Sequence, residues 1–109
     1  MARPSRGTGR IVLKGPVTLP AVEAIHAQFL ALEDRPAITV DCSAVTEADV
    51  SLVQLILAAR ASARRAGRSV ALAKPAGGAL LDTLERGGFL SAARDNAPDY
   101  HDFWLGSRS

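Results

Sequence analysis

Residues 40–52 read Val40-Asp41-Cys42-Ser43-Ala44-Val45-Thr46-Glu47-Ala48-Asp49-Val50-Ser51-Leu52, and this stretch decides the fold of the 109-residue chain. A β-prone run, Ala37 to Cys42, leads through a polar connection, Ser43 to Ala48, onto the longest helical pattern, Val50 to Ala66. That pattern carries one apolar stripe at three- and four-residue spacing, made of Leu52, Leu55, Ile56, Ala59 and Ala63. The stretch therefore predicts a buried strand that feeds a long amphipathic helix.

The flanking segments extend this unit on both sides. Gly67 provides a stop for the long helix, and Ser69 to Ala73 is the next strand candidate. A strand, a helix of this length and a strand predict a right-handed crossover between parallel strands. Upstream, Arg10 to Lys14 predicts a short strand that stops at Gly15-Pro16, and Val17 to Leu19 predicts a second extended piece.

Further helices are expected on either side. One begins at Pro20, because proline is favoured at a helix start and the next apolar residues keep helical spacing, at Val22, Ile25, Phe29 and Leu32. A shorter one covers Ala79 to Arg86 and is ended by Gly87-Gly88. The segment Asp99 to Leu105 fits either a short helix or an edge strand.

Composition excludes several classes of protein. Cys42 is the single cysteine, which rules out an intramolecular disulfide and argues against a zinc site of the usual multi-cysteine kind. No apolar run approaches the roughly 20 residues of a membrane span, and the N-terminus lacks the apolar stretch of a signal peptide. Aromatic residues are only 5% of the chain, too few for a base-stacking surface. We expect a cytoplasmic protein with no membrane insertion and no nucleic-acid partner.

The formal net charge of +2 arises at the N-terminus. Of the 13 basic residues, Arg3, Arg6 and Arg10 lie in the first ten positions, where there is no acid, so the remainder has 10 bases against 11 acids, or −1. Residues 1–8 also lack any periodicity. We expect a flexible basic arm over residues 1–8, followed by one domain over residues 9–109.

No motif with known catalytic mechanics is present. The chain has no Gly-x-Ser-x-Gly elbow, no phosphate loop, no His-Glu-x-x-His pair and no Gly-x-Gly-x-x-Gly after a strand. It also offers no cluster of convergent polar residues to line a deep pocket. We expect no catalytic residue, no metal site and no cofactor.

The start of the long helix is the candidate functional site. Asp49 is placed as the N-cap of that helix, and Ser51 lies at about its second position, where a phosphoryl group would sit at the positive end of the helix dipole. The helical face of Ser51 is small-residued and lightly charged, which favours a flat docking surface, and it includes Gln54, Ala58, Ser62 and Arg65. The alternative is that Ser51 is an ordinary helix-start serine and that the alanines only favour helix formation.

Four arginines lie in and just after the last turns of the long helix, namely Arg60, Arg64, Arg65 and Arg68. Cations there complement the helix dipole, so the simpler interpretation is a solvated charged face. The alternative is a site for an acidic partner.

Several segments together resemble one protein family. Ile38 to Val45, Asp49 to Leu52, Ala66 to Leu72 and Leu84 to Phe89 resemble, in this order, the STAS domain of bacterial anti-sigma-factor antagonists and of stand-alone STAS proteins from chemotaxis operons. The similarity covers about residues 9 to 92. It implies an α/β fold, a single STAS-like domain with a mixed sheet of about four to five strands and helices packed mainly on one face.

The resemblance also implies a function. In the family the inner strand is commonly followed by Asp-Ser-Ser-Gly, whose second serine is phosphorylated by a partner kinase. Asp49 matches that aspartate and Ser51 the phosphorylated serine, whereas Val50 replaces the first serine and Leu52 the glycine.

We therefore expect a non-catalytic signalling module that binds an anti-sigma, histidine-kinase-like or other signalling protein. The predicted docking residues are Asp49, Val50, Ser51, Leu52, Gln54, Ala58 and Ser62. The alternative is a constitutive accessory subunit without phosphorylation, either of an ATPase complex of the lipid-trafficking ABC transporter type or of a chemotaxis complex. The apolar Val50 and Leu52 favour that alternative, and a homodimer is also compatible with the sequence.

Overall fold

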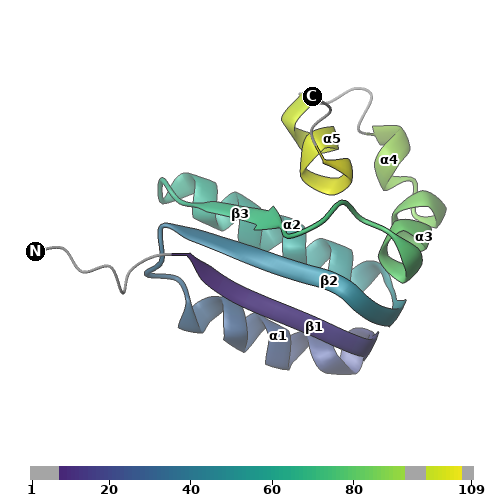
Figure 1. Ribbon diagram of the computed structural model, residues 1–109, viewed down its shortest axis with the longest axis horizontal. Coiled ribbons are helices and arrows are strands. Elements are labelled where there is room, and N and C mark those ends of the chain that lie inside the picture. Colours follow the sequence, from purple (N-terminus) through teal and green to yellow (C-terminus); the bar gives the residue numbers. More distant parts are fainter. Residues whose placement is uncertain (1–7, 93–97, 107–109) are drawn as a thin grey trace, which may run out of the picture.

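The computed structural model describes residues 8–92 and 98–106 (Figure 1). Its helices and strands, in chain order, are β1 (Gly9–Val17), α1 (Leu19–Ala31), β2 (Ala37–Ala48), α2 (Val50–Arg65), β3 (Ser69–Leu72), α3 (Gly78–Arg86), α4 (Phe89–Ala92) and α5 (Pro98–Leu105). Of the predicted basic arm, residues 1–8, only Thr8 lies within the described residues. Arg10, which contributes to the N-terminal charge, is already part of β1.

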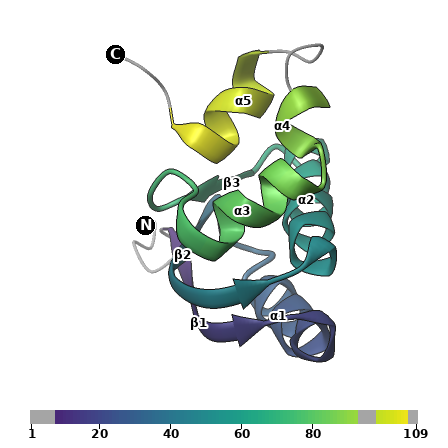
Figure 2. The same ribbon diagram turned by 90° about the vertical axis from the view of Figure 1, so that its right-hand side faces the viewer.

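The three strands form one sheet in the order β1-β2-β3, and both neighbouring pairs are parallel. The register places Val40 of β2 between Ile11 of β1 and Leu72 of β3. Helices α1 and α2 make the two crossovers and lie on the same face of the sheet (Figures 1 and 2). The α/β class, the parallel crossover and the placement of the helices mainly on one face are thus confirmed.

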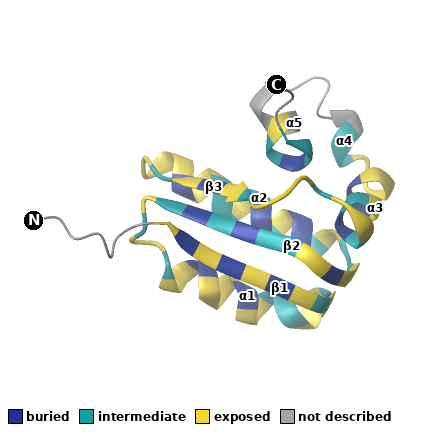
Figure 3. Ribbon diagram, viewed as in Figure 1, coloured by how far each residue is buried: buried dark blue, intermediate teal, exposed yellow. Residues whose placement is uncertain are grey.

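The core lies between this face of the sheet and the two crossover helices. Along β1, buried Ile11 and Leu13 alternate with exposed Arg10, Val12 and Lys14, as expected for a strand with one solvated face (Figure 3). Of the predicted apolar stripe on α2, Leu52, Ile56 and Ala63 are almost or fully buried, whereas Leu55 and Ala59 are only partly buried. Val53, which was not part of the predicted stripe, is also fully buried. The strand that decides the fold and the helix that follows it therefore supply much of the core.

The described sheet has fewer strands than predicted and is parallel throughout rather than mixed. The predicted break at Gly15-Pro16 is absent, because Gly15 adopts a positive φ of 70° and the register shifts on both sides of it, which keeps Val17 in β1. Pro16 is tolerated because β1 is an edge strand. Leu19 then begins α1, and Asp99 to Leu105 belongs to α5, so neither candidate forms an additional strand.

The central strand is longer than predicted. Ser43 to Ala48, expected as a polar connection, continues β2 because it pairs with the second half of β1, with Val45 opposite Gly15 and Ala48 opposite Val17. Val45 is also buried, which anchors the extension in the core. As a result, Asp49 stands directly at the end of the central strand, next to the end of β1.

The C-terminal helices close the end of the domain where the strands finish. The Oγ1 of Thr83 in α3 lies within hydrogen-bond distance of two carbonyl oxygens, that of Ala79 in its own helix at 2.9 Å and that of Ala48 at the end of β2 at 3.2 Å. Trp104 of α5 is fully buried, and its carbonyl oxygen accepts from the amide of Ala76 at 2.6 Å. The guanidinium of Arg60 lies 4.9 Å from the ring centroid of Phe103, a cation–π contact that joins α2 to α5.

Leu52 offers a test of the role of this stretch in the fold. Its side chain is 0% exposed, so we expect Leu52→Ala to lower the free energy of unfolding by about 2–5 kcal/mol through lost burial and a residual cavity. The matched control, Leu30→Ala, removes a leucine that is 52% exposed and should cost about 0.5 kcal/mol or less. Urea denaturation followed by circular dichroism measures both; equal losses would show that Leu52 does not anchor the core.

Candidate functional site

The carboxylate of Asp49 caps two helices at once. Its Oδ1 accepts the backbone N–H of Ser51 at 3.0 Å and also the Ser51 hydroxyl, and its Oδ2 accepts the backbone N–H of Leu19 at 3.1 Å. Thr18, the N-cap of α1, makes no side-chain capping bond. Asp49, at the end of the neighbouring strand β2, therefore provides the side-chain acceptor for the start of α1. The predicted N-cap role of Asp49 on α2 is confirmed, and its bond to α1 is an addition.

These hydrogen bonds keep Asp49 ionised. The bond from the Ser51 hydroxyl is the largest cause that lowers the pKa of Asp49, and the backbone N–H groups of Leu19, Ser51 and Leu52 act in the same direction. The starts of α1 and α2, each the positive end of a helix dipole, both face this carboxylate. The site therefore already holds one negative charge at two helix N-termini.

Exposed apolar side chains flank Ser51. Ser51 itself is half-buried, whereas Val50 is 42% exposed and Leu19 is 66% exposed. We call Leu19, Asp49, Val50 and Ser51 the helix-start surface. Leu19 was not among the predicted site residues, because no local pattern links it to Asp49, 30 positions away. The only sequence signal was its position just before Pro20, which marks the start of α1.

The other predicted docking residues divide into two groups. Gln54, Ala58 and Ser62 are exposed on α2, on the same helical face as Ser51. Leu52 is completely buried, so its side chain cannot reach a partner that docks on this surface. The replacement of the family's glycine by Leu52 therefore changes the core rather than the access to Ser51.

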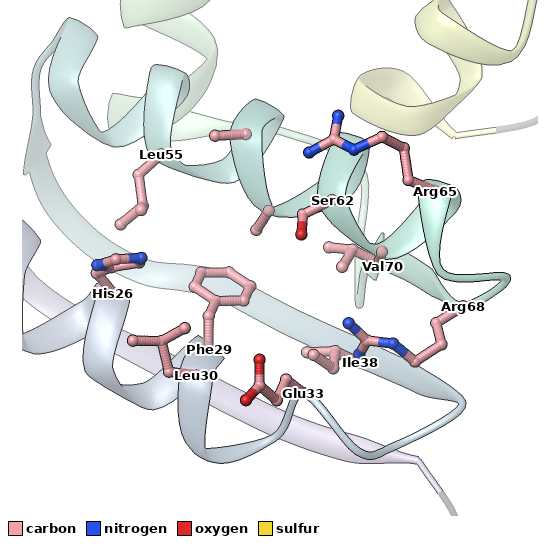
Figure 4. Close-up of a pocket in the computed structure, with 13 residues that line it drawn as sticks. His26, Phe29, Leu30, Glu33, Ile38, Leu55, Ser62, Arg65, Arg68 and Val70 are labelled. Atoms are coloured by element: carbon pink, nitrogen blue, oxygen red, sulfur yellow. The ribbon is translucent and has the colours of Figure 1, made fainter.

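Ala58 and Ser62 also border a groove between α1 and α2, with a volume of about 310 Å³ (Figure 4). Phe29 and Ile38 lie at its floor, and both are buried. The predicted docking face of α2 thus continues from the helix-start surface to the edge of a cleft, which no residue pattern in the sequence had indicated.

Two other side chains, Asp41 and Cys42, have shifted pKa values, and local contacts within the fold explain both shifts. Asp41 accepts hydrogen bonds from the amide and hydroxyl of Ser43 and pairs with Arg10 at 2.9 Å, and the Ser43 hydroxyl bond is the main cause that lowers its pKa. Burial, and next the charge of Asp41, raises the pKa of the Cys42 thiol to about 11, so this thiol is protonated at neutral pH. Within the described residues, no three His, Cys, Asp or Glu side chains are grouped as metal ligands.

Comparison with known proteins places this geometry in a family context. The family model described as "Mlab, STAS domain" matches residues 1–90. A sulfate transporter family protein from Wolinella succinogenes is similar in structure, with a TM-score of 0.61 and 15% sequence identity over 93% of this chain and 85% of that chain.

The SulP transporter STAS domain from Vibrio cholerae is also similar, with a TM-score of 0.54 and 17% identity over 84% of this chain and 70% of that chain. At these identities the two structures show a shared fold. No curated protein matches the sequence. Of the helices in residues 8–92 and 98–106, none has the length and apolar character needed to cross a membrane.

The shared cap predicts an acid-sensitive contribution to stability. The pKa of Asp49 is lowered in the folded state, so its contribution is complete above the ordinary aspartate pKa of about 3.9 and is lost as the pH falls below it. We expect Asp49→Asn to unfold at lower urea than the wild type at pH 7. The difference should shrink between pH 4 and pH 2.

The matched control is Glu47→Gln, which neutralises an exposed carboxylate near the end of the same strand. Urea midpoints at a series of pH values compare the two variants. Amide hydrogen exchange at Leu19 should also accelerate in Asp49→Asn alone. An unchanged Leu19 exchange rate would show that the carboxylate does not hold the start of α1.

Proposed function

The chain belongs to the STAS domain family of the Mlab type, and on that premise we propose that it is a non-catalytic interaction module of bacterial signalling. It acts in the cytoplasm and binds a kinase-like or other signalling protein, such as an anti-sigma factor, through the start of α2. Ser51 is its phosphorylation switch. One observation carries this proposal: the Ser51 hydroxyl bonds to the carboxylate that caps both α1 and α2, with exposed Leu19 and Val50 beside it.

The chemistry of the switch follows from this hydrogen bond. In the unmodified protein the Ser51 hydroxyl donates to Asp49 Oδ1. Transfer of the γ-phosphoryl group of ATP to Ser51 Oγ forms an ester, releases ADP and removes the hydroxyl proton, so Ser51 can no longer donate. The phosphate brings about −1.5 to −2 charges next to the Asp49 carboxylate, and the two helix N-termini offset part of the repulsion.

Phosphorylation would therefore change the surface more than the fold. A partner that packs against Leu19 and Val50 in the unmodified protein would have to bury a dianion beside these apolar side chains. Burial of an unpaired charge in an interface is strongly unfavourable, so the modified protein releases the partner.

A second candidate is a constitutive accessory subunit of an ATPase complex, of the kind found in lipid-trafficking ABC transporters, or of a chemotaxis complex. The exposure of Leu19 and Val50 favours it, because an apolar contact supports permanent association without any phosphate. Stoichiometric co-purification that ATP does not disrupt would support this candidate over the switch.

The switch is tested with the kinase-like protein encoded nearest to this chain. We expect ATP and that protein to place phosphate on Ser51, located by mass spectrometry. Ser51→Asp should weaken partner binding at least about tenfold, because it introduces a charge into the contact, whereas Ser51→Ala should bind within about threefold of the wild type.

Ser69→Asp is the matched control, since it adds the same charge at an exposed serine at the start of β3, away from the helix-start surface. It should leave partner binding unchanged. If Ser51→Asp and Ser51→Ala both bind as the wild type does, Ser51 is not a switch.

A further inference from the structure

The groove between α1 and α2 has an apolar floor, formed by side chains at the edge of the hydrophobic core. The floor is formed by the side chains of Phe29 from α1, Ile38 from β2 and Val70 from β3, which are buried and keep only 3–6% of their surface exposed. Leu55 of α2 and the 52% exposed Leu30 of α1 stand on its two sides (Figure 4). Ala58 and Ala59 of α2 also line it.

One end of the groove is polar and predominantly basic. Arg68 reaches into the groove from the turn after α2, and its Nη1 donates to the backbone carbonyl oxygen of Arg35 at 3.3 Å, which fixes it across that end (Figure 4). Arg65, in the last turn of α2, also lines this end of the groove. Arg60 and Arg64 lie on another face of α2, where they line a separate hollow beside Phe103 of α5. Among the residues that the structure describes, Glu33 is the only acidic side chain that lines the groove.

The length of the groove matches a short helix. Its lining residues on α2 extend from Leu55 to Arg65, which corresponds to about 15 Å at the rise of an α-helix. On the opposite side they run from His26 and Leu30 of α1 to Glu33 in the turn after that helix. Two to three turns of a third helix fit this length. Such a helix presents apolar anchors at i, i+3 or i+4, and i+7, the spacing by which amphipathic helices bind apolar grooves.

We propose that this groove binds an amphipathic helix of a partner protein, with apolar side chains over Phe29 and Leu55 and an acidic side chain at the end that carries Arg65 and Arg68. The charge of that end selects an acidic helix, because two arginines there outweigh Glu33. This proposal rests on the proposed function, since it specifies the chemistry of the partner segment. It concerns the groove at the far end of the docking face, whose lining residues do not include Ser51.

The test uses a displayed library of 16-residue amphipathic helices with randomised apolar and charged positions, selected on the whole protein. We expect enriched sequences to share apolar residues at i, i+3 or i+4, and i+7 and to carry Asp or Glu near one end. Isothermal titration then measures the affinity of one enriched peptide for groove variants.

The Ser62 hydroxyl points from α2 toward the groove, so Ser62→Trp places a large side chain in it (Figure 4). This variant should lower the affinity for the peptide at least about tenfold. Ala61→Trp is its control, because Ala61 is exposed on the same helix but does not line the groove. Thermal melting of both variants establishes that they fold.

The charge of the basic end is tested in both directions. Arg65→Glu should lower the affinity for the peptide, whereas Glu33→Gln should raise that affinity by about twofold to fivefold. A purely structural role of Glu33 does not explain such a gain. Arg64→Glu is the control for Arg65→Glu, since it changes the net charge equally on a neighbouring residue that does not line the groove.

Three outcomes overturn the proposal. The first is that the wild-type protein enriches no helix sequence that the Ser62→Trp variant does not also enrich. The second is that the enriched helices lack acidic residues. The third is that no helix is enriched while sodium decanoate binds saturably in the groove, which would assign the groove to small amphiphiles. The peptide titrations do not involve the partner protein, and the phosphorylation and partner-binding assays of the Ser51 variants do not involve the peptide. Failure of the groove proposal is therefore distinguishable from failure of the proposed function.

Discussion

One carboxylate, that of Asp49, joins the starts of two helices, and the arrangement of the domain depends on it. It reaches both Ser51 and Leu19 because β2 ends at Ala48, paired with Val17 at the end of β1. Each strand then turns directly into a helix on the same face of the sheet. Because the first N–H groups of a helix have no partner within it, a single acceptor between two helix starts fixes their relative position.

This constraint explains why the start of α2 is a suitable place for a switch. The backbone around Ser51 is held by Asp49 and by the buried Leu52, so a change at the Ser51 hydroxyl alters the surface charge without removing core packing. The backbone N–H groups of Ser51 and Leu19 remain as donors for Asp49. A partner would therefore meet a surface whose backbone is already fixed, so little conformational entropy is lost when the interface forms.

Local patterns were sufficient to predict α2, its stop at Gly67 and the capping role of Asp49, because each depends on residues within a few positions of one another. The extension of β2 through Val45 could not be predicted in this way, since it depends on pairing with β1, about 30 residues earlier. The same applies to Leu19 in the site and to the groove, whose walls come from separate helices. Sequence reasoning therefore predicted the cap at Asp49 and missed the contacts that tertiary packing places around it.

The two departures from the family pattern have different physical meanings. Leu52, in place of glycine, fills the core beneath the helix, whereas Val50, in place of serine, adds apolar surface next to Ser51. Together with Leu19, Val50 makes the unmodified site more apolar than a serine pair would, which strengthens contact with an apolar partner surface. Under the proposed switch, the same apolar surroundings would increase the cost of placing a dianion there. The substitution that tightens the unmodified contact would then also widen the difference in partner affinity between unmodified and phosphorylated Ser51.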